Sequence, residues 1–132
     1  MAFIKFKPLT PVFNFRKIIT KDYPKYIYDY IEDEEIIYAY ATSKDIALFT
    51  NKQIVLFNKR GFGKSVKEIS AIPYHSILTS SVFFGPINST IKLTLYNTYP
   101  LTLSFLNNID KVIIKKTYML IETKIKNKFK EN

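Results

Sequence analysis

The sequence predicts a mainly β fold: a partly open, seven-stranded antiparallel barrel capped by a C-terminal α-helix, with an extra helical segment at the N-terminus. The middle of the chain supports this with short runs rich in Ile, Val, Phe and Tyr, separated by brief turns. Its C-terminal part has one broad apolar arc at helical spacing. The 132 residues, 47% hydrophobic and without cysteine, suffice for one domain that needs no disulfide.

The first 32 residues are expected to form an extension that contains a short helix. Apolar residues recur there at the spacing of one helix face: Tyr23, Tyr26, Ile27, Tyr30 and Ile31. Asp22 is the expected N-cap, and Pro24 is tolerable in the first turn. A tyrosine-rich face of this kind indicates packing more than ligand binding.

Seven strands are expected in the middle of the chain. Their ranges are 35–42, 45–50, 53–59, 65–71, 77–84, 90–97 and 101–106. Two-residue turns divide the first three strands, Gly61 and Gly63 make a hairpin tip, and Gly85-Pro86 marks a later turn. Pro73 helps the chain to turn a barrel corner. Such a meander must close, or pack on another element, to bury its inner face.

A helix is expected after the last strand. Asn107 or Asn108 can cap it, and Asp110 suits the positive end of its dipole. The apolar arc consists of Ile109, Ile113, Ile114, Thr117, Leu120, Ile121 and Ile125. The opposite side carries Lys111, Lys115, Lys126 and Lys130. We expect the arc to cover one open end of the barrel.

Residues 44–57, Lys-Asp-Ile-Ala-Leu-Phe-Thr-Asn-Lys-Gln-Ile-Val-Leu-Phe, resemble the bacterial pleckstrin-homology (PH) families. In these families an Asp before a strand is followed by Phe-Thr, a tight turn and an apolar strand. The glycine-containing hairpin at Gly63-Lys64, the Ile-Pro-Tyr-x-x-Ile step at 72–77 and the acidic pair Glu34-Glu35 extend the likeness. Gln53 departs from it, because relatives commonly have a basic residue there. The resemblance implies a PH-like domain at 33–132, with 1–32 as the N-terminal extension.

The residue types argue against an enzyme. His75 is the only histidine, and no carboxylate stands near it in the sequence to orient it as a base. Carboxylates gather only at 32–35, which reads as a solvated junction between helix and strand. The run 61–65 lacks the upstream glycine and the strand-to-helix setting of a phosphate-binding loop. We therefore expect no catalytic residue, no metal site and no cofactor.

The net charge of +9 comes mostly from lysine, which supplies 18 of the 20 basic residues. Such a diffuse excess suits weak attraction to anionic lipid, nucleic acid or an acidic protein, whereas bidentate recognition favours arginine. Lys5 and Lys7 interrupt the first apolar run, and prolines break the rest, so it does not read as a secretory signal. We expect a cytoplasmic protein, with peripheral attachment at the inner face of the membrane as an alternative.

Protein binding is the preferred function. Val82, Phe83 and Phe84 lead into a turn, and strand alternation would bury only one of the two phenylalanines. The other would be available to a protein partner or to a second copy of the chain. The PH resemblance also implies a groove between the capping helix and a strand, where a peptide can add as an extra strand. The first 32 residues are a candidate to fill that groove in cis.

Two alternatives stay open. The first is attachment to anionic membrane lipid through a basic-aromatic hairpin and the helix lysines: Lys59, Arg60, Phe62, Lys64, Lys111 and Lys115. Specific inositol-phosphate recognition is disfavoured, because the loop at 42–45 is short and nearly neutral. The second alternative, non-specific nucleic-acid binding, ranks third because the tyrosines and lysines cluster on different predicted helices.

Overall fold

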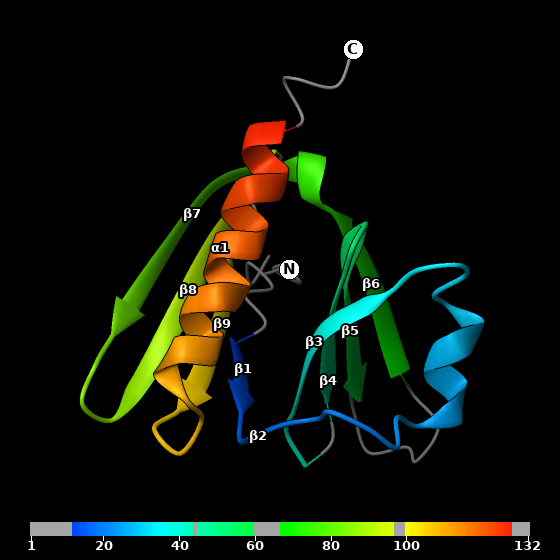
Figure 1. The fold of residues 1–132 in the computed structure, drawn as a ribbon, viewed down its shortest axis with the longest axis horizontal. Helices are drawn as coiled ribbons and strands as arrows, with labels where there is room; N and C mark the ends of the chain where they lie inside the picture. Colours follow the sequence, from blue (N-terminus) through cyan, green and yellow to red (C-terminus); the bar gives the residue numbers. More distant parts are fainter. Residues whose placement is uncertain (1–11, 44, 60–66, 97–99, 128–132) are drawn as a thin grey trace, which may run out of the picture.

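A computed structural model describes residues 12–43, 45–59, 67–96 and 100–127. Two β-sheets stand side by side, and a long helix lies against one of them (Figure 1). The elements follow in chain order as β1 (Val12–Phe15), β2 (Lys17–Ile18), η1 (Lys25–Asp29), β3 (Ile36–Ala41), β4 (Ile46–Thr50), β5 (Gln53–Lys59), β6 (Lys67–Pro73), η2 (Tyr74–Ser76), β7 (Ile77–Phe84), β8 (Asn88–Leu95), β9 (Pro100–Leu106) and α1 (Lys111–Asn127).

The predicted seven-strand meander is confirmed as β3 to β9. One sheet has the order β1-β9-β8-β7, and the other has the order β2-β3-β4-β5-β6. The chain passes from one sheet to the other through η2, directly after Pro73. Within the described residues, β6 and β7 lie in different sheets, so the barrel is open between them. The expected partly open barrel with a C-terminal helix is therefore the observed architecture.

The N-terminal segment takes part in both sheets. β1 pairs in parallel with β9, and β2 pairs antiparallel with β3. The sequence analysis expected only a helix here and missed these two short strands. In its described part, the segment therefore occupies the β9 edge of its sheet and leaves the β7 edge, the expected groove, unfilled. The domain boundary after residue 32 stays a prediction.

The main core fills the space between the two sheets and α1. Its largest buried side chains include Phe15, Tyr40, Phe49 and Phe105, whose rings contact one another. The Thr117 hydroxyl donates to the carbonyl of Ile113, so the Tyr40 hydroxyl is the donor in the 2.5 Å bond between Tyr40 and Thr117. This bond joins α1 to the sheet on the other side of the core.

A second apolar cluster covers the outer face of the β2-to-β6 sheet. Ile27 and Ile31, from η1 and the residues after it, pack there against Ala39, Leu48 and other apolar side chains of the sheet. In Figure 1, η1 lies at the far right, on the side of this sheet away from α1. All five residues of β4 are buried, because it has protein on both faces.

The N-terminal helix differs in kind from the expected one. It is a five-residue 3-10 helix that begins after Pro24, and Asp22 is not its N-cap. Asp22 has a φ of 57°, in the left-handed region. A helix capped by Asp22 would have to place Tyr23 in the α conformation. The proline that follows Tyr23 disfavours this conformation, so the helix begins only after Pro24. Of the predicted apolar face, Ile27 and Ile31 are buried, whereas Tyr30 is 48% exposed.

Helix α1 begins later than expected. Its cap is Asp110, whose carboxylate accepts a 2.9 Å hydrogen bond from the backbone N–H of Val112. Asn108, an expected cap, instead donates from Nδ2 to the carbonyl of Arg16 at 3.0 Å. The predicted apolar arc faces the core: Ile109, Ile114, Thr117 and Ile121 are buried, and Ile113, Leu120 and Ile125 pack beside them. This orientation leaves Lys111 and Lys115 exposed.

Candidate interaction surface

The residues that carry the PH resemblance meet around Thr50. Its hydroxyl donates to Glu34 Oε1 at 2.6 Å and accepts from the backbone N–H groups of Lys52 and Gln53. Gln53 Nε2 donates to the other oxygen of Glu34 at 3.1 Å. The Tyr74 hydroxyl donates to the carbonyl of Thr50 at 2.7 Å. These bonds tie the β4–β5 turn to the start of β3 and to the corner between the sheets.

The turn between β7 and β8 exposes aromatic side chains. The backbone N–H of Gly85 donates to the carbonyl of Asn88 at 2.9 Å and closes the turn. Phe83 is 64% exposed, Phe84 is 41% exposed, and Ile87 between the strands is 75% exposed. The expectation that alternation would bury one phenylalanine was therefore wrong.

The position of α1 explains the exposure of Phe84. Val82 is half-buried against the main core, and the Ser80 hydroxyl donates to the carboxylate of Glu122 on α1. Ser80, Val82 and Phe84 are two residues apart along the strand, so their side chains lie on the same face of the sheet, the one that α1 covers. Phe84 lies beside the first turn of α1, which covers it only in part, whereas Phe83 faces the other side.

Phe84 shares an apolar hollow with the first turns of α1. The hollow has a volume of about 240 Å³ and is lined by Phe84, Lys111, Val112 and Lys115. Val112 is 57% exposed, and Lys111 Nζ lies 3.4 Å from the carbonyl oxygen of Gly85. The structure thus brings the expected protein-binding residue Phe84 together with two expected lipid-binding lysines.

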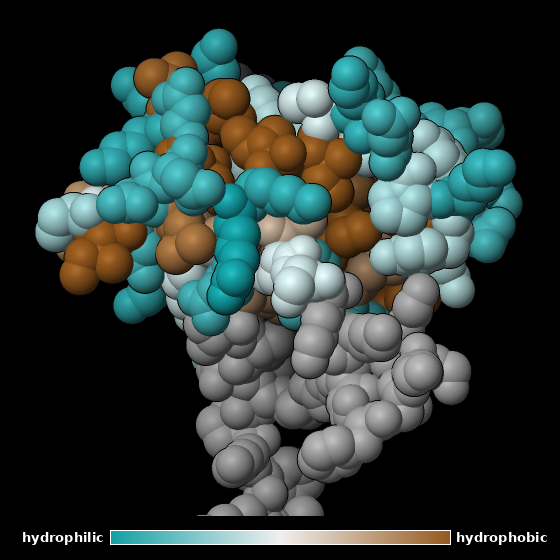
Figure 2. All heavy atoms as spheres, turned by 90° about the horizontal axis from the view of Figure 1, so that it is seen from below, coloured by the Kyte–Doolittle hydropathy of each residue, from teal (hydrophilic) through white to brown (hydrophobic). Residues whose placement is uncertain are grey.

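We call this region the tip surface and define it as Phe83, Phe84, Ile87, Lys111, Val112 and Lys115. Figure 2 views the molecule from below, with the β7–β8 turn of Figure 1 on its left side. Hydrophobic and hydrophilic atoms lie next to each other at that edge. Sequence reasoning noted Ile87 only as the end of an apolar segment and missed Val112, because their proximity depends on how the turn and the helix are placed together.

The remaining lipid-binding candidates belong to the β5–β6 connection. Lys59 is the last residue of β5, in the sheet that α1 does not lie along. Arg60, Phe62 and Lys64 lie outside the described residues. The basic-aromatic hairpin therefore stays a prediction.

Among the described strands, β7 is one of the two outer strands of its sheet and pairs with β8 alone. The Gly85–Asn88 hydrogen bond shows which residues of β7 form backbone hydrogen bonds with β8, because these alternate along an antiparallel strand. Phe83 and Ser81 form such bonds. The N–H and C=O groups of Ser80, Val82 and Phe84 therefore point away from β8. None of its eight residues is charged or proline. Strand β7 therefore offers an uncharged backbone edge next to the tip surface.

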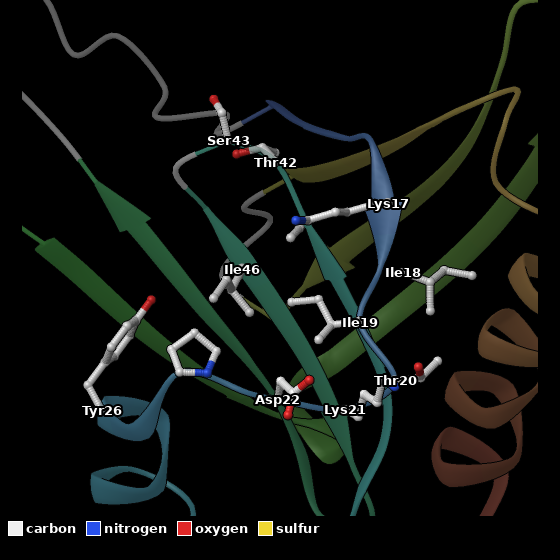
Figure 3. Close-up of a pocket in the computed structure, with 12 residues that line it drawn as sticks. Lys17, Ile18, Ile19, Thr20, Lys21, Asp22, Tyr26, Thr42, Ser43 and Ile46 are labelled. Carbon is white, nitrogen blue, oxygen red and sulfur yellow. The ribbon is translucent and has the colours of Figure 1, made fainter.

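A larger hollow lies beside the N-terminal segment, with a volume of about 570 Å³. Figure 3 shows the side chains of Lys17, Ile19 and Ile46 extending into the space between this segment and β4. Burial, and secondly the carboxylate of Asp45, raise the pKa of Tyr26, which also lines it. The sequence analysis did not anticipate this hollow, because it treated the segment as lying outside the domain.

The residues weighed for other chemistry lie apart from the tip surface. His75 is exposed in η2, at the strand corner where it was expected. In the described ranges, no three His, Asp or Glu side chains gather closely enough to hold a metal ion. No helix within the same ranges has the length and apolar character to span a membrane.

A family model described as Bacterial PH domain matches residues 10–123. The chain belongs to the bacterial PH domain family. Its fold is that of a module for protein or lipid interactions, in a class of domains that is generally non-catalytic. A comparison with curated proteins finds no match.

Solved structures of bacterial PH-domain proteins share the fold. A DUF1696 family protein with a PH domain from Shewanella loihica PV-4 has 24% identity and a TM-score of 0.66, over 76% of this chain and 88% of that one. A PH domain from Shewanella amazonensis SB2B has 26% identity and a TM-score of 0.57, over 71% and 80%. A PH-domain-containing protein from Exiguobacterium sibiricum 255-15 has 17% identity and a TM-score of 0.66, over 89% and 65%.

Proposed function

We propose that this PH domain binds a protein partner by adding an extended segment of that partner to the edge of β7. The tip surface would then contact the partner's side chains. The observation that carries the proposal is the uncharged outer strand β7, which ends in the exposed Phe83 and Phe84. Main-chain hydrogen bonds supply affinity in this mode of recognition, and side-chain hollows supply selectivity.

Among the outer strands of the two described sheets, β1, β2, β6 and β7, the longest one without a charged residue or proline is β7. Natural proteins usually protect an exposed edge with charges, prolines or bulges, because it can pair with another chain. Strand β6, one of the two outer strands of the other sheet, contains Lys67, Glu68 and Pro73. Strand β7 has no such residue, and its irregularity lies at Ile77/Thr79, away from the tip surface.

Proline at Val82 tests strand addition directly. Val82→Pro removes an N–H that faces away from β8, and the extended backbone of Ser81 accommodates a following proline. We would select extended peptides from a random library on the wild-type domain and measure their affinities. Binding should be lost in Val82→Pro and kept in Val82→Thr, the matched variant that retains the N–H.

Hydrogen exchange provides a second readout of the same proposal. A selected peptide should slow exchange of the backbone N–H groups of Ser80, Val82 and Phe84 that point to the free edge. Equal affinity of the peptide for Val82→Pro and for wild type, with no protection of these groups, would contradict strand addition. Self-association through this edge would appear in light scattering as a mass that falls on Phe84→Asp substitution.

Peripheral attachment to an anionic membrane is the second candidate. The hollow that Phe84 shares with Lys111 and Lys115 favours it, because an apolar tip beside lysines suits the lipid interface. Vesicle sedimentation with and without anionic lipid separates the two candidates. Binding that requires anionic lipid, and that is lost in Phe84→Ser but kept in Val82→Pro, would replace strand addition with membrane attachment.

A further inference from the structure

We propose that the partner segment forms a strand antiparallel to β7. From its N-terminal end, this segment has one or two acidic residues and then a large apolar residue. This inference rests on the proposed strand addition and specifies the chemistry of the partner. It follows from the shape of the hollow at Phe84 and from the distribution of charge along the α1 side of the β7 edge.

The hollow selects an apolar side chain. In an added strand, the residue opposite Phe84 places its side chain on the same side of the sheet as Phe84. That side holds the hollow between Phe84, Val112 and the two lysines. A leucine, isoleucine or methionine there would cover Phe84 and Val112, which are both substantially exposed in the free domain.

The charges beside the edge change sign along β7. Lys111 and Lys115 are exposed at the Phe84 end, and Lys111 Nζ lies near the Gly85 carbonyl. Asp110, the carboxylate next to them in sequence, is engaged in capping the helix at Val112. Glu122 lies further along, where it accepts the hydrogen bond from Ser80. An anionic group is therefore favoured at the tip end of the edge and disfavoured toward Ser80.

The direction of the partner follows from this polarity. Antiparallel pairing continues the pattern of β7 with β8 and is the more stable ladder per residue. An antiparallel partner passes Gly85 before it reaches Phe84, so its acidic residues come before its apolar anchor. A second copy of β7 does not supply this pattern, because the strand contains no carboxylate.

Fluorescence anisotropy with synthetic peptides and the full chain tests the inference. The reference peptide has two aspartates, one spacer residue, a leucine anchor and a strand-forming tail of threonine, valine and serine. The comparison peptides replace both aspartates with lysine, replace leucine with alanine, or reverse the order. We expect the reference peptide to bind about five- to tenfold more tightly than the lysine peptide. That advantage should shrink as salt is raised.

Charge-reversal variants identify the lysines that are responsible. Lys111→Glu with Lys115→Glu should invert the preference between the aspartate and lysine peptides. Lys126→Glu, an exposed change in the last turn of α1, is the matched control and should leave the preference unchanged. Circular dichroism establishes that each variant retains its helix.

The outcomes separate this inference from the proposed function. Equal affinity for the aspartate and lysine peptides, with both lost in Val82→Pro, would overturn the acidic partner and leave strand addition intact. An aspartate preference that survives Val82→Pro would overturn strand addition. No binding of any peptide, combined with binding to anionic vesicles or with a dimer abolished by Phe84→Asp, would overturn both.

Discussion

Thr50 shows how one buried side chain connects distant parts of the chain. It receives backbone hydrogen bonds from its own turn and donates to Glu34, sixteen residues earlier. The acidic residue that the PH resemblance places before the first strand thus has a structural role here. Gln53, the departure from the family pattern, donates to the same carboxylate. A basic residue at that position would reach the same partner as an ion pair.

Gln53→Lys should therefore be tolerated and slightly stabilising. The new ammonium group would pair with the partly buried carboxylate of Glu34, which we expect to add about 0.5 kcal/mol to the free energy of unfolding. Urea denaturation at low and high salt measures the gain, which salt should reduce. Gln53→Met, which has similar length and no hydrogen-bond donor, is the control and should destabilise the domain. Equal stability of the Gln53→Lys and Gln53→Met variants would show that the interaction with Glu34 does not stabilise the domain.

Tyr40 is the polar link between α1 and the β2-to-β6 sheet. Burial raises its pKa from 10.0 to about 12. The folded domain therefore keeps this phenol neutral at pH values where the unfolded chain ionises. Its contribution to stability is complete below pH 10 and is lost as the pH rises from about 10 through about 12.

Tyr40→Phe should show this loss as a difference between two pH profiles. Near pH 8 the variant should be less stable by about 1 kcal/mol, because the bond to Thr117 is gone. Above pH 10 this difference in the free energy of unfolding should become smaller or reverse. Keeping Tyr40 protonated then costs the folded wild type about 2–3 kcal/mol, a cost that the variant does not have. Urea denaturation from pH 8 to 12 tests this, with the exposed Tyr28→Phe as control. Parallel profiles would contradict the raised pKa.

At the scale of elements, the β7–β8 turn depends on a glycine. A Cβ atom at Gly85 would lie 2.8 Å from the carbonyl oxygen of Asn88 and 2.8 Å from Cε2 of Phe83. The phenylalanine ring could rotate away, but the Asn88 oxygen belongs to the backbone. The turn and the position of Phe83 therefore both require the absence of a side chain at this residue.

Gly85→Ala should shift the turn and destabilise the domain by about 1–3 kcal/mol. Thermal unfolding measures the cost, and Pro86→Ala, an exposed change in the same turn, is the matched control. We expect peptide affinity at the tip surface to fall as well, since Phe83 must move. Unchanged stability and unchanged peptide binding would show that the turn adapts without moving Phe83.

The strands and the main helix were predictable because their patterns are local. The expected ranges for β5 and β7 match the observed strands, since apolar alternation and turn residues bound them on both sides. The start of η1 was not predictable from spacing alone, because Pro24 restricts the residue before it. β1 and β2 were missed because such short strands gain their stability from β9 and β3, which are distant in sequence.

The tip surface was only partly predictable for a related reason. Exposed phenylalanines before a Gly-Pro turn are visible in the sequence, and so are the helix lysines. Their meeting depends on α1 running antiparallel along β7, with Lys111 at Gly85 and Glu122 at Ser80. That alignment is a tertiary feature, which no periodicity within either segment contains.

At the scale of the whole molecule, the β2-to-β6 sheet is the middle layer of three. The main core and α1 lie on one side, and η1 with its flanking residues lies on the other. The N-terminal segment is thus packed against the sheet through buried isoleucines. We expect it to unfold together with the rest of the domain, although the sequence analysis placed a boundary after residue 32.

Ile27→Ala tests this cooperativity. Ile27 is fully buried in the outer cluster, so the variant should lose about 2–4 kcal/mol in one cooperative transition. The neighbouring Tyr28→Ala, at a side chain that is 54% exposed, should cost much less. Denaturation followed by circular dichroism and by tyrosine fluorescence should give the same midpoint. A separate early transition would instead show that the segment detaches from the sheet by itself.

The complete burial of β4 also ranks the parts of the molecule by how readily they open. Deuterium should enter β4 last, because exposing its amides requires removing protein from both of its faces. The edge of β7, which pairs with β8 alone among the described strands, should exchange early and through small local fluctuations. A peptide can therefore bind at the edge of β7 without a rearrangement of the buried core.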